Sequence, residues 1–266
     1  MKLPLYQVDA FTDKIFGGNS ACVVPLDHWL PDQTLLKIAF ENAVAETAFF
    51  LRNENGFHLR WFTPEFEMDL CGHATLATAH ILKTQLDYSK DKIIFQSKSG
   101  ELTVTIENDL YCLDFPSRKP LPVALPENIR LSLDRQPSEV LGSRDLVLVY
   151  ENEQDIRDIK INRQYFDEIN MDPGGVIVTA KGKDSDFVSR FFTPQASIFE
   201  DPATGSAHCS LIPYWSERLG KNKMTAIQLS SRVGKFYCID NGERVLISGK
   251  ARTYFEGSIS IDEEMI

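Results

Sequence analysis

An internal repeat limits the folds open to this chain more than any other feature of its sequence. The segment RWFTPEFEMDLCGHATLATAH (Arg60–His80) resembles RFFTPQASIFEDPATGSAH (Arg190–His208) at an offset of about 130 residues. Downstream, Phe95–Phe115 matches Leu229–Gly249 in pattern, and a helix-like stretch followed by an apolar run precedes each FTP motif. Matches in the same order at one offset indicate that a structural unit occurs twice. We therefore predict two similar lobes.

The pattern within each copy predicts the architecture. Each copy contains an amphipathic helix, an apolar strand, a strand ending in FTP, a glycine-bearing loop, a longer helix and antiparallel strands. The predicted fold class is α+β, with two pseudo-symmetric lobes, each a mixed or antiparallel sheet wrapped around a central helix. We place the first lobe at residues 1–118 and the second at 119–266, with a proline-rich crossing at about 116–145 and the terminal strand free to pack on the other lobe. A cleft between two lobes is the usual place for a ligand.

Composition narrows the classes of partner. The net charge of -10 argues against binding to nucleic acid or to an anionic membrane surface. The five cysteines are scattered without a CxxC pair, which is typical of reduced thiols in a cytoplasmic protein. No apolar run approaches the length of a membrane span, and the first residues lack the apolar core of a signal peptide. We expect a cytoplasmic protein that acts on a small molecule.

Glu46 is the most unusual residue of the first copy. It lies in the apolar run NAVAETAFFL, where a carboxylate would be drawn inward with its neighbours at a considerable cost in free energy. Two interpretations are open: a solvated strand end, or a functional acid. Its counterpart in the second copy falls near Gly175 or Val176, so the carboxylate does not recur. A polar group that differs between copies of one scaffold is a candidate for chemistry.

The same comparison singles out two further residues. His73 faces Thr204 or Ala203 in the other copy, and Asp201 faces Leu70. Neither polar side chain is repeated. Both therefore join Glu46 as candidates.

The two glycine-bearing loops predict an anion site. Gly72 in the first loop and Gly205 and Ser206 in the second precede helices that begin with small residues. Glycine lets a ligand approach the backbone, and a helix N-terminus presents unpaired N–H groups with a partial positive charge. Two interpretations are open: ordinary glycine-containing loops before helices, or loops that bind the carboxylate of a small acid through backbone donors and Ser206.

Other site types fit the sequence less well. A metal site built from Cys71, His73, His80 and His208 lacks compact zinc-ligand spacing. A cysteine hydrolase using Cys71 and His73 is disfavoured because residues two apart on a tight turn rarely form a nucleophile–base pair. The chain has neither a GxGxxG nor a GxxxxGK[ST] motif. No metal and no cofactor is predicted.

The blocks GGNSACVV, NAVAETAFF, FTPEFEMDLCGHATLA and FTPQASIFEDPATGSAH resemble the signature blocks of the phenazine-biosynthesis PhzF-like family. The resemblance runs through essentially the whole chain in the right order. It implies the two-lobed diaminopimelate epimerase fold, a cofactor-independent isomerase or epimerase, a small carboxylic acid substrate and a homodimer.

The resemblance also implies roles for particular residues. Glu46 stands where the family has the acid/base that moves a proton between substrate carbons. His73 and Asp201 stand where the substrate's polar groups are held and protons relayed. Gly72, Gly205 and Ser206 stand at the carboxylate-binding positions, and Asn19 lies in the GNSA block beside the site. Burial moves a carboxyl group's pKa toward the working pH that proton abstraction from carbon requires.

This chain departs from related patterns at three places. Cys71 matches one of the two acid/base cysteines of diaminopimelate epimerase, but the second aligns with Pro202, which excludes a two-thiol racemase. Ala45 precedes Glu46, at a position where family members often have a serine. The segment SSRVG lacks the paired glycines often seen there, and we therefore assign Arg232 no role in the site. The rival hypothesis is a non-catalytic protein that binds or senses a small carboxylate on the same fold.

Overall fold

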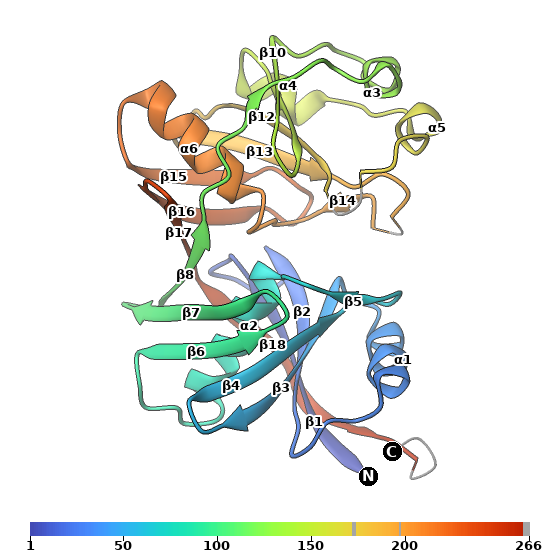
Figure 1. The fold of residues 1–266 in the computed structure, drawn as a ribbon, viewed down its shortest axis with the longest axis vertical. Helices are drawn as coiled ribbons and strands as arrows, with labels where there is room; N and C mark the ends of the chain where they lie inside the picture. Colours follow the sequence, from blue (N-terminus) through green and yellow to red (C-terminus); the bar gives the residue numbers. More distant parts are fainter. Residues whose placement is uncertain (172–173, 197, 263–266) are drawn as a thin grey trace. The chain divides into compact units, whose positions relative to one another are not determined.

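The computed structural model describes residues 1–171, 174–196 and 198–262. The chain divides into two compact units. The first contains Met1–Asp114 and Ser248–Ile266, and the second contains Phe115–Ile247. The last strand pairs with the first strand of the chain, and Figure 1 shows the two side by side in red and blue. The first unit is therefore formed by two segments of the chain, and the whole of the second unit lies between them in the sequence.

The first unit contains one long buried helix among many strands. Its elements are β1 (Lys2–Ala10), β2 (Asn19–Pro25), α1 (Asp32–Asn42), β3 (Glu46–Asn53), β4 (Gly56–Phe62), β5 (Glu67–Met68), α2 (Gly72–Thr84), β6 (Lys92–Ser97), β7 (Gly100–Glu107), β8 (Leu110–Pro116) and β18 (Ala251–Ser260).

The second unit has the same kinds of element. They are β9 (Leu121–Pro122), α3 (Glu127–Ser132), β10 (Glu139–Gly142), β11 (Leu146–Val149), α4 (Glu153–Asp158), α5 (Arg163–Phe166), β12 (Val176–Lys181), β13 (Phe187–Phe192), β14 (Glu200–Asp201), α6 (His208–Leu219), β15 (Lys223–Gln228), β16 (Gly234–Asn241) and β17 (Arg244–Gly249).

Strand pairing repeats between the units. In the first, β1 pairs antiparallel with β2, β2 parallel with β3, β3 antiparallel with β4, β4 parallel with β6, and β6 antiparallel with β7. In the second, β10, β11, β12, β13, β15 and β16 repeat these five pairings in the same order and directions. Each unit is thus a mixed sheet, and the repeat read from the sequence is a repeat of topology.

The sequence explains why α2 becomes the central helix of its unit. Every residue from Gly72 to Leu82 is buried, and a helix that is apolar or small on all sides belongs in a core. Its glycine, alanine and threonine residues let strands approach closely, and it packs on β1, β2, β3 and β18 (Figure 1). In the second unit α6 packs on β15 and β16 and is capped at its C-terminus by Gly220, whose φ of 65° suits a residue without a Cβ.

Strand register aligns the two copies residue by residue. Phe62 pairs with Glu67 on β5, and Phe192 pairs with Glu200 on β14. Glu67 and Glu200 are therefore equivalent, and the second copy holds three extra residues between its FTP motif and this glutamate. Counting on from there, Cys71 corresponds to Thr204 and His73 to Ser206, not to the positions that the sequence alignment gave. The place of a second cysteine is taken by Thr204 and not by Pro202.

A repeated ion pair supports this register. Arg60 Nε lies 2.7 Å from Glu67 Oε1, and Arg190 Nε lies 2.7 Å from Glu200 Oε1. Each guanidinium also lies over an aromatic ring, that of Phe62 at 5.0 Å in the first unit and that of Phe192 at 4.9 Å in the second.

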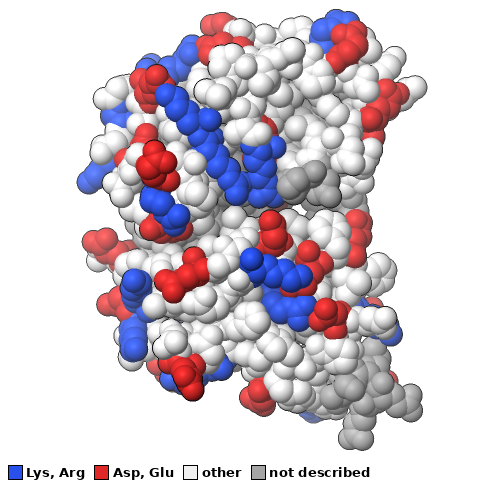
Figure 2. Space-filling model, viewed as in Figure 1, with Lys and Arg blue, Asp and Glu red and all other residues white. Residues whose placement is uncertain are grey.

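Charged side chains lie on the surface with both signs close together. On the face drawn in Figure 2, blue and red side chains lie near one another in groups that white areas separate. Several form ion pairs, such as Lys83 with Asp91 at 2.8 Å. Within the described part of the chain, no helix is long and apolar enough to cross a membrane.

Candidate active site

Glu46 is the first residue of β3 and lies at the edge of the first unit's core. The chain reaches it from α1 through Ala43, which adopts the left-handed conformation and ends the helix. Thr47 and the three residues that follow are buried, whereas the Glu46 side chain is 14% exposed. The carboxylate is thus mostly withdrawn from water. The interpretation of Glu46 as a solvated strand end is wrong.

The carboxylate faces an imidazole. His73 is the second residue of α2, and its Nε2 lies 3.0 Å from Glu46 Oε2. Both atoms are buried, and neither has a well-aligned hydrogen bond with a described residue. A close contact without good hydrogen-bond geometry is costly in a core, because each buried polar atom loses its interaction with water. Such atoms are the ones a substrate group would engage.

The other nitrogen of His73 has its own neighbours. Nδ1 lies 3.2 Å from Asn19 Nδ2 and 3.6 Å from Cys71 Sγ, and all three side chains are buried. When the Asn19 amide donates to Nδ1, the neutral imidazole carries its proton on Nε2, the nitrogen that faces Glu46. Asn19 is therefore placed to orient His73.

Burial and charge act in opposite directions on this cluster. Burial by itself would lower the pKa of His73, but Cys71 and the Glu46 carboxylate beside it raise that pKa well above its usual value. Burial and the Glu46 charge raise the pKa of the Cys71 thiol, although His73 opposes them. We take the carboxylate as the main cause for the imidazole, because the raised pKa of Cys71 keeps its thiol protonated.

The three side chains are close enough together to suggest a metal site. One ligand atom each from Glu46, Cys71 and His73 can be chosen within 4.8 Å of the others. However, the carboxylate contacts Nε2 and the thiol contacts Nδ1, on different sides of the ring. The groups are arranged as a chain through the imidazole and do not converge on one cation.

The two other histidines considered as metal ligands, His80 and His208, make hydrogen bonds or ring contacts with neighbouring side chains. His80 Nδ1 lies 2.9 Å from the Tyr111 hydroxyl and its Nε2 lies 3.1 Å from Thr253 Oγ1, so both nitrogens are paired. His208, in the second unit, is stacked on Phe236 with ring centroids 3.8 Å apart.

Asp201, Gly205 and Ser206 lie in the second unit: Asp201 is the last residue of β14, and Gly205 and Ser206 lie on the loop between β14 and α6. The Thr204 hydroxyl donates to Asp201 Oδ2 at 2.5 Å. Gly205 and Ser206 form the tight turn that leads into α6, accepting hydrogen bonds from the backbone N–H groups of His208 and Cys209. Gly72, the remaining predicted residue, is the buried first residue of α2, next to His73. The structure thus brings Glu46, His73, Asn19 and Gly72 together in the first unit, and Asp201, Gly205 and Ser206 in the second.

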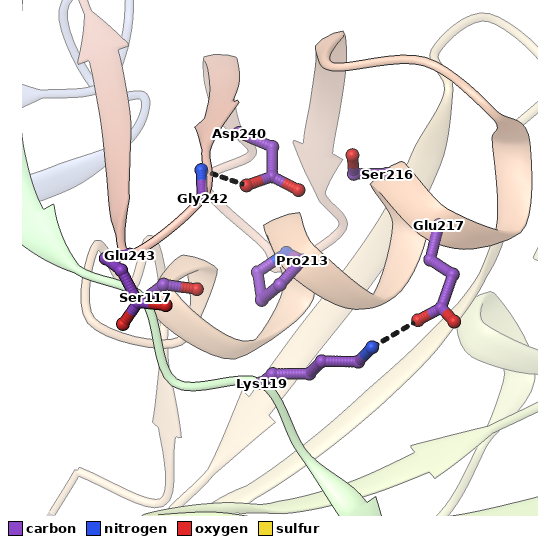
Figure 3. A pocket seen from close by; sticks show the side chains of 8 residues that line it. All are labelled: Ser117, Lys119, Pro213, Ser216, Glu217, Asp240, Gly242 and Glu243. Atoms are coloured by element: carbon purple, nitrogen blue, oxygen red, sulfur yellow. Dashed lines mark hydrogen bonds and ion pairs between the residues drawn. The ribbon is translucent and has the colours of Figure 1, made fainter.

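A surface hollow of about 410 Å³ in the second unit does not contain the predicted residues (Figure 3). Its walls carry the carboxylates of Glu217, Asp240 and Glu243. Lys119 pairs with Glu217 at 2.7 Å, and Asp240 accepts a hydrogen bond from the backbone of Gly242 at 3.0 Å. Such an acidic hollow is poorly suited to a carboxylate ligand.

The arrangement of strands and helices defines the class of the protein as an α+β fold that is shared with epimerases and racemases. A hydroxyproline epimerase from Agrobacterium vitis superposes with a TM-score of 0.59, covering 99% of this chain and 94% of that chain at 9% identity. This likeness confirms the predicted fold class, and at this identity it is evidence for the fold alone.

The family follows from closer matches. The family model described as phenazine biosynthesis-like protein matches residues 8–257, and the chain belongs to this family. A protein of Pseudomonas aeruginosa named as an uncharacterized isomerase is 45% identical over 262 residues, covering 98% of this chain and 100% of that one. The crystal structure of a PhzF family protein from Enterococcus faecalis has a TM-score of 0.94 at 41% identity, covering 98% of this chain and 100% of that one. The predicted resemblance is confirmed, and the family is one of isomerases.

Proposed function

We propose that the protein is an isomerase that moves a proton between carbons of a small carboxylic acid, with Glu46 as the acid/base. The observation that carries this proposal is the 3.0 Å approach of Glu46 Oε2 to His73 Nε2, between two buried atoms without aligned hydrogen bonds. A carboxylate held away from water and next to a proton donor is suited to taking a proton from carbon.

The proposed reaction begins with proton removal. Glu46 takes a proton from one substrate carbon, and the electron pair of that C–H bond moves into the conjugated system that ends at the carboxylate. Protonation of a different carbon then gives the isomer. Either Glu46 returns the proton itself, or His73 donates its proton and regains one from Glu46, so that both side chains are restored. His73 holds a proton beside Glu46 because its pKa is raised, so the pair can exchange a proton without an external acid.

The proposal assigns substrate binding to the small-residue loops. Gly72 at the start of α2, and Gly205 and Ser206 before α6, are proposed to hold the substrate carboxylate through backbone N–H groups and the Ser206 hydroxyl. Asp201 is proposed to hold a polar group of the substrate and to relay protons. Donors at the carboxylate would stabilise the negative charge that develops as the proton leaves.

Heavy water tests the proposal against the rival binding protein. A panel of amino and hydroxy carboxylic acids is incubated with the wild type, with Glu46→Gln and with the control Glu41→Gln, which changes an exposed glutamate on α1. Deuterium at carbon in the wild type and the control, but not in Glu46→Gln, supports the isomerase. Binding of an acid without labelling in any of the three proteins supports the non-catalytic protein.

The proposal includes a homodimer, and β18 is the surface that supports it. Tyr254 and Phe255 are 50% and 45% exposed, and they lie where the pairing of β18 with β1 shifts register between Gln7 and Val8. Phe16, 65% exposed, adds its ring 5.5 Å from that of Tyr254. A group of exposed aromatic side chains is typical of a surface that another chain covers.

A further inference from the structure

The loop that carries Asp201 is held in place by a buried glutamine. Gln228, the last residue of β15, is fully buried. Its Nε2 donates to the backbone oxygen of Asp201 at 2.6 Å, and its Oε1 accepts from the backbone N–H of Thr204 at 2.8 Å. One side chain thus fixes the backbone at both ends of a four-residue turn.

The same glutamine reaches the Asp201 side chain through Thr204. Gln228 Nε2 also lies 3.1 Å from Thr204 Oγ1, and the Thr204 hydroxyl donates to Asp201 Oδ2. With the amide donating to the threonine oxygen, the hydroxyl proton is left to point at the carboxylate. The orientation of Asp201 therefore depends on the Gln228 amide.

The turn that follows β15 contacts the two residues in between. The Ser230 hydroxyl donates to the backbone oxygen of Pro202 at 2.8 Å and accepts from the backbone N–H of Val233 at 3.1 Å. A Cβ on Gly234 would lie 2.6 Å from the Ala203 Cβ, so this position has room only for glycine. Each residue of the 201–204 turn is thus contacted by the 228–234 segment.

The repeat shows which of these contacts belong to the scaffold. Phe57 pairs with Phe95 and Phe187 pairs with Ala226, which makes Ser99 the counterpart of Ser230. Ser99 donates to the backbone oxygen of Asp69 at 2.7 Å, the position equivalent to Pro202, so this serine bond occurs in both copies.

The glutamine contact occurs only once. By the same register Ser97 stands where the second copy has Gln228, and its hydroxyl donates to Gly100 within its own turn at 2.9 Å. A scaffold contact would be expected in both copies. The glutamine occurs in the copy that has Asp201. At the position equivalent to Asp201, the first copy has Met68.

We propose that Gln228 is a positioning residue for Asp201 and for the turn that leads to Ser206. It acts through its amide, which satisfies the buried N–H of Thr204 and directs the Thr204 hydroxyl to the Asp201 carboxylate. The hydrogen bonds of Gln228 do not depend on what the protein does, whereas their consequence for catalysis rests on the proposed function.

Two variants separate the two ends of the amide. Gln228→Leu has a similar size but no polar atom, and it leaves the Thr204 N–H buried without a partner. Gln228→Glu retains an acceptor for that N–H but loses the donor to Asp201 and Thr204. Ser97→Ala is the matched control, because it changes the equivalent residue of the first unit, which contacts only its own turn.

Amide hydrogen exchange read residue by residue is the first measurement. Exchange at Thr204 should become at least about fivefold faster in Gln228→Leu, since losing one hydrogen bond of this kind is worth about 1 kcal/mol and leaves a buried donor unpaired. Gln228→Glu and Ser97→Ala should stay within about threefold of the wild type at this amide. Unchanged exchange at Thr204 in Gln228→Leu would overturn the inference. Urea unfolding of each variant shows whether any change is local.

Deuterium labelling of an acid from the panel is the second measurement. Gln228→Glu should raise the half-saturating acid concentration about tenfold or more, and should lower the maximal rate by a smaller factor. A purely structural role predicts the wild-type concentration dependence for the folded fraction, and that result would overturn the positioning role. If the wild type labels no acid of the panel, the proposed function fails, and exchange at Thr204 alone decides the role of Gln228.

Discussion

Glu46 and Gly175 occupy the same place in the two copies of the sheet. Thr47 pairs with Phe62 and Val176 pairs with Phe192, so the residues before them are equivalent. A Cβ on Gly175 would lie 2.5 Å from Phe191 Cζ and 2.8 Å from the Phe192 backbone oxygen. The second copy therefore has no room for any side chain where the first has its candidate base.

This relationship predicts that Gly175→Ala destabilises the protein. The added methyl group must displace a buried ring and a backbone oxygen, and overpacking of this kind costs about 1–3 kcal/mol. Urea unfolding measures the loss. Gly142→Ala is the milder control, because its nearest contact would be 3.2 Å from a Val123 methyl group. Equal unfolding free energies for Gly175→Ala and the wild type would contradict the close packing around Gly175.

The repeat was the part of the fold that the sequence predicted best. The FTP motifs end β4 and β13, and small residues mark the starts of α2 and α6, so local patterns located these elements. Alignment across the loops failed because three extra residues precede Glu200, and only hydrogen-bond pairing on β13 shows where they lie. Insertions in loops leave no periodic signal.

The candidate site was predictable to a similar degree. Glu46 and His73 stood out because neither side chain is repeated, and they lie in contact. The contact of Asn19 with His73 joins β2 to α2, and a sequence alone does not show which residues of distant elements meet. Gln228 was missed because it lies in an ordinary strand sequence, and its role is visible only through its bonds to Thr204 and Asp201.

His73 should titrate well above pH 6.5 in the wild type and at lower pH in Glu46→Gln. The carboxylate stabilises the imidazolium, so its removal leaves burial, which lowers the pKa. A raised folded-state pKa contributes stability that is fully present below pH 6.5 and is lost as the pH rises through the folded-state value. NMR titration of the His73 ring nitrogens measures both proteins. Titration at the same pH in both would contradict the pairing.

His208 should make the protein less stable in mild acid. Burial lowers its pKa to about 4, so the unfolded chain binds a proton near pH 6.5 that the folded chain does not. Stability is then present above pH 6.5 and is lost as the pH falls toward 4, by up to about 3 kcal/mol. Urea unfolding between pH 7 and 4.5 should show a smaller decrease for His208→Gln than for the wild type. The exposed His28→Gln serves as the control. Equal pH dependence in His208→Gln and the wild type would refute this assignment.

Tyr254→Lys should weaken the proposed dimer. A charge in the centre of the β18 surface would have to be desolvated on association, which is costly without a partner. Light scattering after size-exclusion chromatography should show a dimer for the wild type and a shift toward monomer for the variant. Tyr237→Lys on β16, where the tyrosine is 43% exposed, controls for added charge. A monomeric wild type at high protein concentration would refute the dimer proposal.

The central claim is that the Glu46 carboxylate carries the proton, and shortening or neutralising that side chain tests it most directly. The rate of deuterium uptake at the substrate carbon is measured in heavy water for the wild type, Glu46→Asp and Glu46→Gln. We predict about a hundredfold loss for Glu46→Asp, because the carboxylate is withdrawn by about 1 Å, and background labelling for Glu46→Gln. Labelling by Glu46→Gln at the wild-type rate would contradict the account.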